Sequence, residues 1–191
     1  MDGSGEKIRA FICFKLPEDI RQLVYREATR KLQATDTRCS WVTPDRMHLT
    51  LKFLGDVPSG RIPEIASALE EALEGRSLVS LSLGEIGKFG GRIPRVIWAG
   101  VEGDIDNLAE IASSVDEAMA GLGFEREKRR YSPHLTLARV RKTRGIDRLL
   151  AAMEEISLPP EEFEIGKVIL MKSELTPHGS VYTPLAEFEL Q

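Results

Sequence analysis

The hydrophobic positions of this chain switch repeatedly between the two-residue period of a strand and the longer period of a helix. The segment KIRAFICFKL (7–16) alternates apolar and polar residues and predicts a strand. Residues 16–33 predict a helix, because Pro17 suits a first turn and apolar residues recur at helical spacing. Further helices are expected at 62–74, 105–120 and 146–155. Further strands are expected at 38–43, 47–55, 77–89, 95–101, 132–140, 163–175 and 181–190.

The chain also repeats itself. The tetrapeptide HLTL begins at His48 and again at His134, and these are two of the three histidines in the sequence. LSLGEIGKF (81–89) resembles FEIGKVILM (163–171), at an offset of 82 residues that is close to the 86 between the histidines. Two matches at nearly one offset indicate two related lobes. The prediction is a single α+β domain over residues 1–191, bilobed about an approximate twofold axis, with two antiparallel sheets facing a central cleft and helices on the outside.

Strict alternation determines which side chains of each HLTL strand share a face. One face of the first strand is expected to carry His48, Thr50 and Lys52. Its other face is expected to carry Leu49, Leu51 and Phe53. In the second strand the shared face carries His134, Thr136 and Ala138. If both strands face one cleft, that cleft holds two imidazoles and two hydroxyls.

Two imidazoles suit general acid–base catalysis, since histidine titrates near neutral pH. Threonine hydroxyls are neutral donors for phosphoryl oxygens on which charge develops. The expected substrate is a phosphodiester with a neighbouring 2′-hydroxyl or a cyclic phosphate, with no metal and no cofactor. The chain has no HExxH, paired CxxC, GxxxxGK[ST], GxGxxG or nucleophile-elbow motif, which argues against other chemistries. His178, in TPHGS, is interpreted as an incidental turn residue.

Composition and charge refine this picture. The chain is 42% hydrophobic and 29% charged, as ordinary globular proteins are. Its net charge of −4 argues against a general duplex-binding protein. However, residues 125–148 hold nine Lys or Arg against three Asp or Glu. This basic segment is either a solvated loop or an anion-binding surface around the second HLTL.

The sequence gives no sign of export or membrane insertion, because it lacks a signal-peptide pattern and a long apolar run. Cys13 and Cys39 are not spaced as a metal or redox motif and are interpreted as reduced thiols of a cytoplasmic protein. Trp41 is assigned to the core. A monomer is expected, since the cleft needs only one chain.

The paired HxT motifs resemble those of the two-histidine phosphoesterase superfamily. More closely, HLTLKFLG, PHLTLAR and SELTPHGSVY are similar to the RNA 2′,3′-cyclic phosphodiesterase family, historically named 2′-5′ RNA ligase (LigT/ThpR). RAFICFKLPEDI resembles the start of that family and GKFGGRIPRVIWAGV its middle, so the resemblance covers roughly residues 8–190.

The resemblance implies metal-independent opening of a terminal 2′,3′-cyclic phosphate on RNA, leaving a 2′-phosphate. It implies that His48 and His134 are catalytic. We assign His134 as base and His48 as acid, with the reverse order left open by the repeat. Thr50 and Thr136 would hold the non-bridging phosphate oxygens.

The resemblance also carries over to four further residues. Arg139 matches a phosphate-contacting arginine, although alternation places it opposite His134 unless the strand bulges. Phe53 and Tyr131 match aromatic positions that either stack on a base or pack in the core. Tyr182 lies in the matched GSVY and would line the cleft.

Two other functions stay open. The same site using a 5′-hydroxyl in place of water would be a 2′-5′ RNA ligase acting on tRNA halves. A non-catalytic RNA-end or nucleotide-binding module would bind without turnover. In each case the expected partner is an RNA end, with no membrane and no obligate protein partner, and residues 126–148 would guide the RNA backbone.

Overall fold

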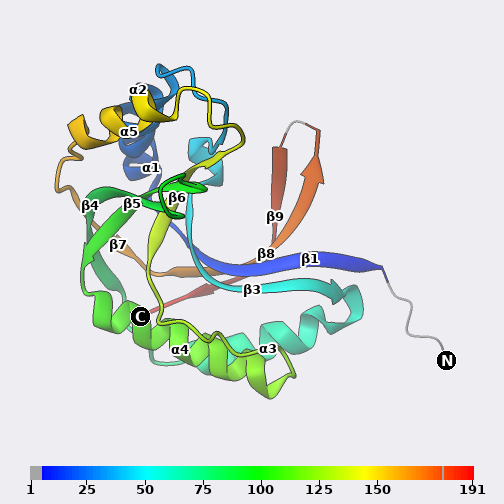
Figure 1. The fold of residues 1–191 in the computed structure, drawn as a ribbon. Helices are drawn as coiled ribbons and strands as arrows, with labels where there is room; N and C mark the ends of the chain where they lie inside the picture. The colour runs from blue at the N-terminus through cyan, green and yellow to red at the C-terminus, as the bar shows by residue number, and fades with distance from the viewer. Residues whose placement is uncertain (1–5, 178) are drawn as a thin grey trace.

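A long antiparallel sheet curls around itself in the computed structural model, which describes residues 6–177 and 179–191 (Figure 1). The strands are β1 (Lys7–Lys15), β2 (Cys39–Trp41), β3 (His48–Pro58), β4 (Val79–Phe89), β5 (Val96–Gly103), β6 (His134–Val140), β7 (Glu162–Ile165), β8 (Lys167–Thr176) and β9 (Gly179–Glu189). His178 lies outside the described residues, so its interpretation as a turn residue stays a prediction.

The helices are α1 (Glu18–Val24), α2 (Arg30–Gln33), α3 (Ile62–Leu73), α4 (Ile105–Gly121) and α5 (Ile146–Glu155). The predicted bounds of the last three agree within one residue. The helix predicted at 16–33 is interrupted by a π-helical segment, Tyr25–Thr29, which joins α1 to α2. No helix within the described residues is both long and apolar enough to cross a membrane.

The sheet has the order β7–β4–β5–β6–β3–β1–β8–β9, with β2 paired to β6, and all of these pairs are antiparallel. The first four strands and the last four form two halves, which meet at one residue pair, Leu49 on β3 and Leu135 on β6. The α+β class is therefore confirmed. The two predicted sheets, however, are halves of one hydrogen-bonded sheet, and the twofold axis stays a prediction.

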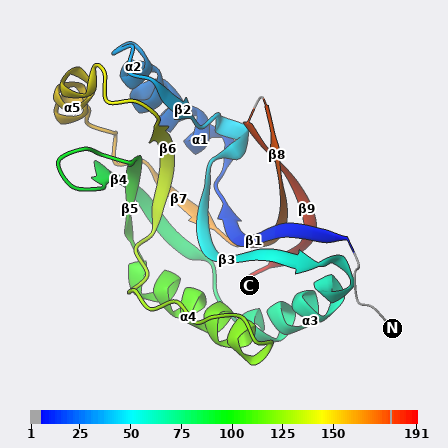
Figure 2. The same ribbon diagram turned by 45° about the vertical axis from the view of Figure 1, so that its right-hand side comes forward.

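The single strand predicted at 163–175 is wrong, because Gly166 separates two strands that pair with different partners. β7, before this glycine, pairs with β4, whereas β8, after it, pairs with β1 in the other half. Because the sheet is curled, the half that contains β4 and the half that contains β1 come close together where β7 leads into β8 (Figure 2). A Cβ at Gly166 would lie 2.2 Å from a terminal side-chain carbon of Leu78, so a larger residue here would require the exposed Leu78 side chain to move.

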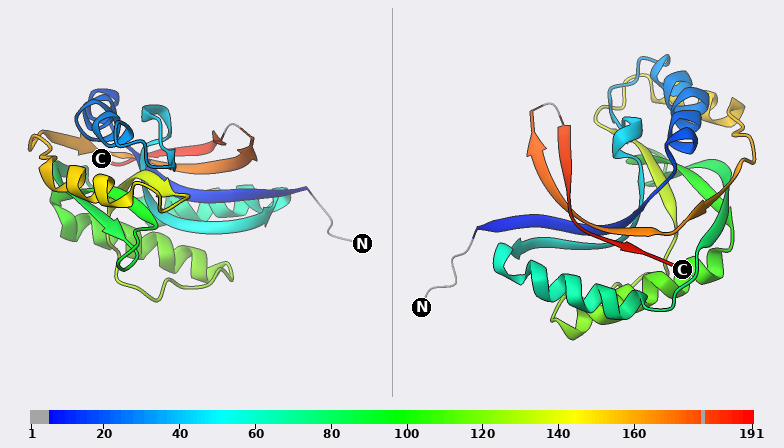
Figure 3. Two further views of the ribbon diagram at one scale, coloured as in Figure 1. Left: turned by 45° about the horizontal axis from the view of Figure 1, so that its top comes forward. Right: turned by 180° about the vertical axis from the view of Figure 1, so that it is seen from behind.

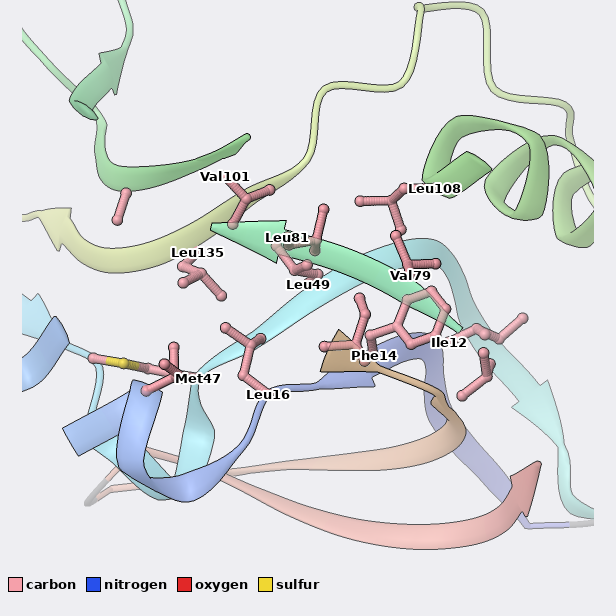
Figure 4. Packing of buried hydrophobic residues seen from close by; sticks show 14 of the residues in the cluster. Ile12, Phe14, Leu16, Met47, Leu49, Val79, Leu81, Val101, Leu108 and Leu135 are labelled. Atoms are coloured by element: carbon pink, nitrogen blue, oxygen red, sulfur yellow. The ribbon is translucent and has the colours of Figure 1, made fainter. Parts of the chain in front are cut away.

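Helices cover the convex side of the curled sheet in two groups. α3 and α4 pack on each other and against β3, β4 and β9. α5 packs against α2 and β4, and the π-helical segment packs against β6 (Figure 3). The enclosed core includes Phe14, Leu81 and the two leucines of the central pair, Leu49 and Leu135 (Figure 4). Burial of one such leucine contributes about 1.5–3 kcal/mol, so the core holds both HLTL strands firmly in place.

Candidate active site

The two HLTL segments open β3 and β6 side by side. Leu49 and Leu135 point into the core, so the histidine before each leucine and the threonine after it face the concave side. His48, Thr50, His134 and Thr136 together line one cleft of about 590 Å³. The structure thus brings together the four side chains that the repeat singled out, and their catalytic roles stay a prediction.

Each HLTL strand carries a β-bulge at its second leucine. Across from β3, Ile12 pairs with Lys52 and Cys13 with Thr50, which leaves Leu51 as the extra residue. Across from β6, Ile97 pairs with Ala138 and Trp98 with Thr136, which leaves Leu137 as the extra residue. Because one extra residue inverts the alternation, the side chains just beyond each bulge lie on the face opposite to the one that strict alternation gives.

The bulge at Leu51 corrects the faces predicted for the first strand. Phe53, which alternation placed behind the histidine, lines the cleft and is 63% exposed. Lys52, which alternation placed in the cleft, points away from it and is buried. Its ammonium forms an ion pair with Asp116 of α4 and donates to the carbonyl of Glu125 at 2.8 Å.

The matching bulge at Leu137 brings Arg139 into the cleft. Strict alternation had placed Arg139 opposite His134, with a bulge as the stated exception, and the exception holds. The positive charge of Arg139 lowers the pKa of both histidines, so its guanidinium lies within electrostatic reach of both rings. Arg139 and Phe53 occupy corresponding positions after the two bulges, so one half contributes a cation where the other contributes an aromatic ring.

Each histidine is oriented by the carbonyl two residues before it. Nδ1 of His48 lies 2.7 Å from the carbonyl oxygen of Arg46, and Nδ1 of His134 lies 2.8 Å from that of Ser132. A carbonyl oxygen only accepts, so Nδ1 carries the hydrogen in both rings. In the neutral tautomer Nε2 is therefore the free acceptor on each histidine.

Burial lowers the pKa of His48 to about 4, from an ordinary value of 6.5; the bond to Arg46 opposes this shift, and the charges of Arg139 and His134 add to it. Burial also lowers the pKa of His134, again against its carbonyl bond and with the help of Arg139. Both imidazoles are therefore mainly neutral at pH 7 in the free protein.

Aromatic rings surround His48. The ring centroid of Phe11 lies 4.9 Å from that of His48, and Tyr182 meets His48 edge to face at 5.4 Å. Tyr182 thus lines the cleft, as the resemblance implied, and Phe53 lines it too, which decides between the two positions left open for that ring. Tyr131 does not line it: its side chain packs against the core and its hydroxyl is buried, which raises the pKa of the phenol.

The charge of the cleft is strongly positive. Four arginines line it, and no Asp or Glu is among the described residues that do so. Two of the arginines, Arg139 and Arg141, come from the basic segment 125–148, while Arg9 comes from β1 and Arg46 from the short 3-10 helix Pro44–Arg46 that precedes β3. Elsewhere in that segment basic side chains pair locally, as Lys128 does with Glu125 at 2.8 Å. Only part of the basic segment therefore contributes its positive charge to the cleft.

A family model described as the 2′-5′ RNA ligase superfamily matches residues 18–177. The chain belongs to this superfamily. A relative from Methanothermobacter thermautotrophicus, named RNA 2′,3′-cyclic phosphodiesterase, is 34% identical over 96% of this chain and 100% of its own. A relative of the same name from Thermotoga maritima is 31% identical over 96% of each chain.

Solved structures of the superfamily share the fold. The crystal structure of E. coli LigT complexed with 3′-AMP matches 97% of this chain and 99% of its own, with a TM-score of 0.77 and 24% identity. The recognition made from the sequence motifs is therefore confirmed at the level of family and fold.

In this member of the superfamily, the sequence pattern missed a second aromatic group, beside His134. Phe89 meets His134 edge to face at 4.7 Å, and Trp98 lies 5.3 Å from Phe89 and 6.3 Å from His134 between ring centroids. Phe89 and Trp98 lie on the paired strands β4 and β5. The sequence predicted these two strands but did not show that their aromatic side chains meet His134. One clue was available: Gly87, two residues before Phe89 in a strand, marks a close approach.

Gly87 makes room for Trp98, because a Cβ there would lie 2.2 Å from the indole ring. We expect Gly87→Val to displace the indole and to lower stability by about 1–3 kcal/mol, the usual cost of overpacking. Urea denaturation measures the loss, and tryptophan fluorescence in a Trp41→Phe background reports on Trp98 alone. The control is Gly91→Val, since a Cβ at Gly91 has nothing within 4 Å. Equal effects of the two substitutions would refute this packing role.

Proposed function

We propose that this protein hydrolyses terminal 2′,3′-cyclic phosphates of RNA to 2′-phosphates, with His48 and His134 as a general acid–base pair. The observation that carries the proposal is the duplicated site: two oriented imidazoles, each with a threonine hydroxyl on the same face, line one cleft. The near full-length relatives named RNA 2′,3′-cyclic phosphodiesterase support the same reaction.

The cyclic phosphate would lie between the two imidazoles. Nε2 of the neutral ring accepts a proton from water while the water oxygen bonds to phosphorus. The bond from phosphorus to the ribose 3′-oxygen breaks, and the protonated ring donates its proton to that oxygen. The products are a 2′-phosphomonoester and a 3′-hydroxyl. Thr50 and Thr136 donate hydrogen bonds to the non-bridging oxygens, and Arg139 offsets the charge that develops on them.

The two histidines differ in how readily each one holds a second ring proton. Since burial lowers the pKa of His48 to about 4, His48 is the ring that is already neutral in the free protein, as a general base must be. His134 is less deeply buried and holds a proton more readily. This order favours His48 as base and His134 as acid, the reverse of the assignment made from the sequence.

The donor set of the cleft favours a reaction without a metal ion. Within residues 6–177 and 179–191, no group of three or more His, Cys, Asp or Glu is placed to hold a metal. The positive charge that stabilises a phosphoryl transition state can come instead from the guanidinium of Arg139.

The test is to incubate the pure protein, in EDTA, with a short RNA that ends in a 2′,3′-cyclic phosphate. The proposal expects a 2′-phosphate as the product. A strict metal requirement would contradict the mechanism. Joining of an added 5′-hydroxyl RNA, with little hydrolysis, would favour the ligase. RNA binding without turnover would favour a non-catalytic module.

The pH dependence of kcat/KM is expected to be a bell with its maximum on the acid side of 6.5. Activity rises as pH increases through the pKa of the base, which must be neutral, and falls through the pKa of the acid, which must be protonated. Both pKa values are lowered in the free protein, to about 4 for His48. The profile of kcat should lie at higher pH, because the bound phosphate anion raises both values. A maximum of kcat/KM above pH 7 would contradict the lowered values.

A further inference from the structure

The cleft carries more positive charge than a single cyclic phosphate requires. A cyclic phosphodiester has one negative charge, whereas four arginines line the cleft and no described carboxylate does. Arg139 is the arginine whose charge reaches both histidines, so it serves the reacting phosphate. The other three line the same cleft and supply cationic capacity for further phosphates.

One of these outer arginines continues directly from the site along β1. Arg9 is two residues from Phe11, so both side chains lie on the concave face, about 6.6 Å apart along the strand. Phe11 in turn lies 4.9 Å from His48. Arg9 therefore stands one side-chain row beyond the aromatic ring that touches the histidine.

An open aromatic surface lies beside this row. The centroid of the Phe53 ring lies 6.1 Å from that of Phe11, and Phe53 is 63% exposed, whereas Phe11 is almost fully buried. Burying an aromatic ring usually contributes to stability, and the bulge at Leu51 instead turns Phe53 outward. An exposed ring and an arginine that line one cleft are the combination that binds single-stranded RNA through a stacked base and a phosphate.

We propose that Arg9 and Phe53 form a subsite for the nucleotide that precedes the cyclic end, with its base on Phe53 and the phosphate that joins it to the terminal nucleotide at Arg9. This inference rests on the proposed function and makes the substrate an RNA strand rather than a nucleoside 2′,3′-cyclic phosphate. It also assigns a direction: the strand leaves the histidines along β1, away from Arg141.

The first experiment compares kcat/KM for a nucleoside 2′,3′-cyclic phosphate and for a dinucleotide with the same cyclic end. The wild type should prefer the dinucleotide by about tenfold or more, which is what one stacked base and one phosphate contact supply. Arg9→Ala and Phe53→Ala should each reduce this ratio severalfold. Arg141→Ala, at the other end of the cleft, and Arg30→Ala, exposed on α2, should leave the ratio unchanged. Equal kcat/KM for the two substrates, or a loss of the ratio only in Arg141→Ala, would overturn the subsite.

A binding measurement keeps the inference separate from the catalytic proposal. Titration calorimetry with a nucleoside 2′-phosphate and with the matching dinucleotide 2′-phosphate needs no turnover. Each phosphate bound on a single strand adds about 0.7 to the slope of log K against log salt. The dinucleotide should show this added slope with the wild type and lose it with Arg9→Ala. Tighter dinucleotide binding without turnover would sink the catalytic proposal alone, whereas turnover with no added slope would sink the subsite alone.

Discussion

Replacement of either His48 or His134 by alanine is expected to lower kcat on a cyclic RNA end by about 10³-fold or more, because one general acid or base contributes about 10²–10⁴-fold. KM should change much less, since the threonines and Arg139 remain in the cleft. The double replacement should be hardly worse than the worse single one, because a proton donor without its matching acceptor retains little function. Single-turnover kinetics on the three variants measures these losses. A loss of less than tenfold for either histidine would remove it from the acid–base pair.

Tyr131→Phe provides the control for these variants. It removes a buried hydroxyl that has no hydrogen-bond partner among the described residues and does not line the cleft. We expect kcat to stay within about twofold of the wild type and stability to rise slightly, since an unsatisfied buried hydroxyl is unfavourable. A large loss of kcat in Tyr131→Phe would restore this residue to the site.

A substrate with sulfur in place of the ribose 3′-oxygen distinguishes the acid from the base. A thiolate leaves without protonation, so the variant that lacks the acid should regain most of its activity on this substrate. The lowered pKa of His48, caused mainly by its burial, predicts that His134→Ala is rescued and that His48→Ala is not. Rescue of His48→Ala alone would establish the opposite order.

The repeat of HLTL was sufficient to locate the centre of the site, for a physical reason. Both copies place leucines at the spacing that a strand buries, and the structure buries Leu49 and Leu135 against each other across the joint of the two half-sheets. The histidines and threonines must then emerge on the concave side. The faces of these four residues could be predicted because burial of the leucines fixes the orientation of their neighbours.

Alternation failed just beyond each repeat, because bulges depend on the pairing partner. Nothing in LKF or LAR marks Leu51 or Leu137 as an extra residue, and no glycine accompanies either. The extra residue is defined only by the register against β1 and β5, which are distant in the sequence. Alternation within the strand therefore could not show that Phe53, and not Lys52, lines the cleft.

The break at Gly166 was hidden for a similar reason. FEIGKVILM reads as one continuous strand, and its two parts do both form strands. They pair with different halves because the sheet is curled, and curvature is a property of the whole sheet. The aromatic group of Phe89 and Trp98 was missed likewise, since it is assembled across two strands.

The buried ion pair of Lys52 and Asp116 links the two strands of the site through α4. Asp116 also accepts a hydrogen bond from the backbone N–H of Glu127 at 3.1 Å, and Lys52 donates to the carbonyl of Glu125. Burial raises the pKa of Asp116, but the bonds from Lys52 and Glu127 outweigh it and hold the pKa below its ordinary range. The segment between α4 and His134 is thus anchored by this pair to β3, the strand that carries His48.

Lys52→Met is therefore expected to lower the free energy of unfolding by about 2–3 kcal/mol. Removing one partner of a fully buried pair costs about 3–5 kcal/mol, and the loss is smaller here because Asp116 is 19% exposed and can be rehydrated. Asp116→Asn should cost at least as much, since it leaves an ammonium that is only 6% exposed without its counter-charge. The double variant Lys52→Met/Asp116→Leu should recover part of the loss, because no buried charge remains. Urea denaturation of the single and double variants gives the coupling energy.

The matched control is Lys167→Met, which removes a lysine that contacts Glu187 and Glu189 at 3.0 and 2.9 Å but is 42% exposed. Exposed ion pairs contribute little to stability because water and salt screen them, so this variant should unfold almost like the wild type. If Lys52→Met were no more destabilising than Lys167→Met, the buried pair would not anchor the His134 segment. Lys52→Met should also lower kcat more than it raises KM, because the segment that leads to His134 loses its tie to β3 while the arginines of the cleft stay in place.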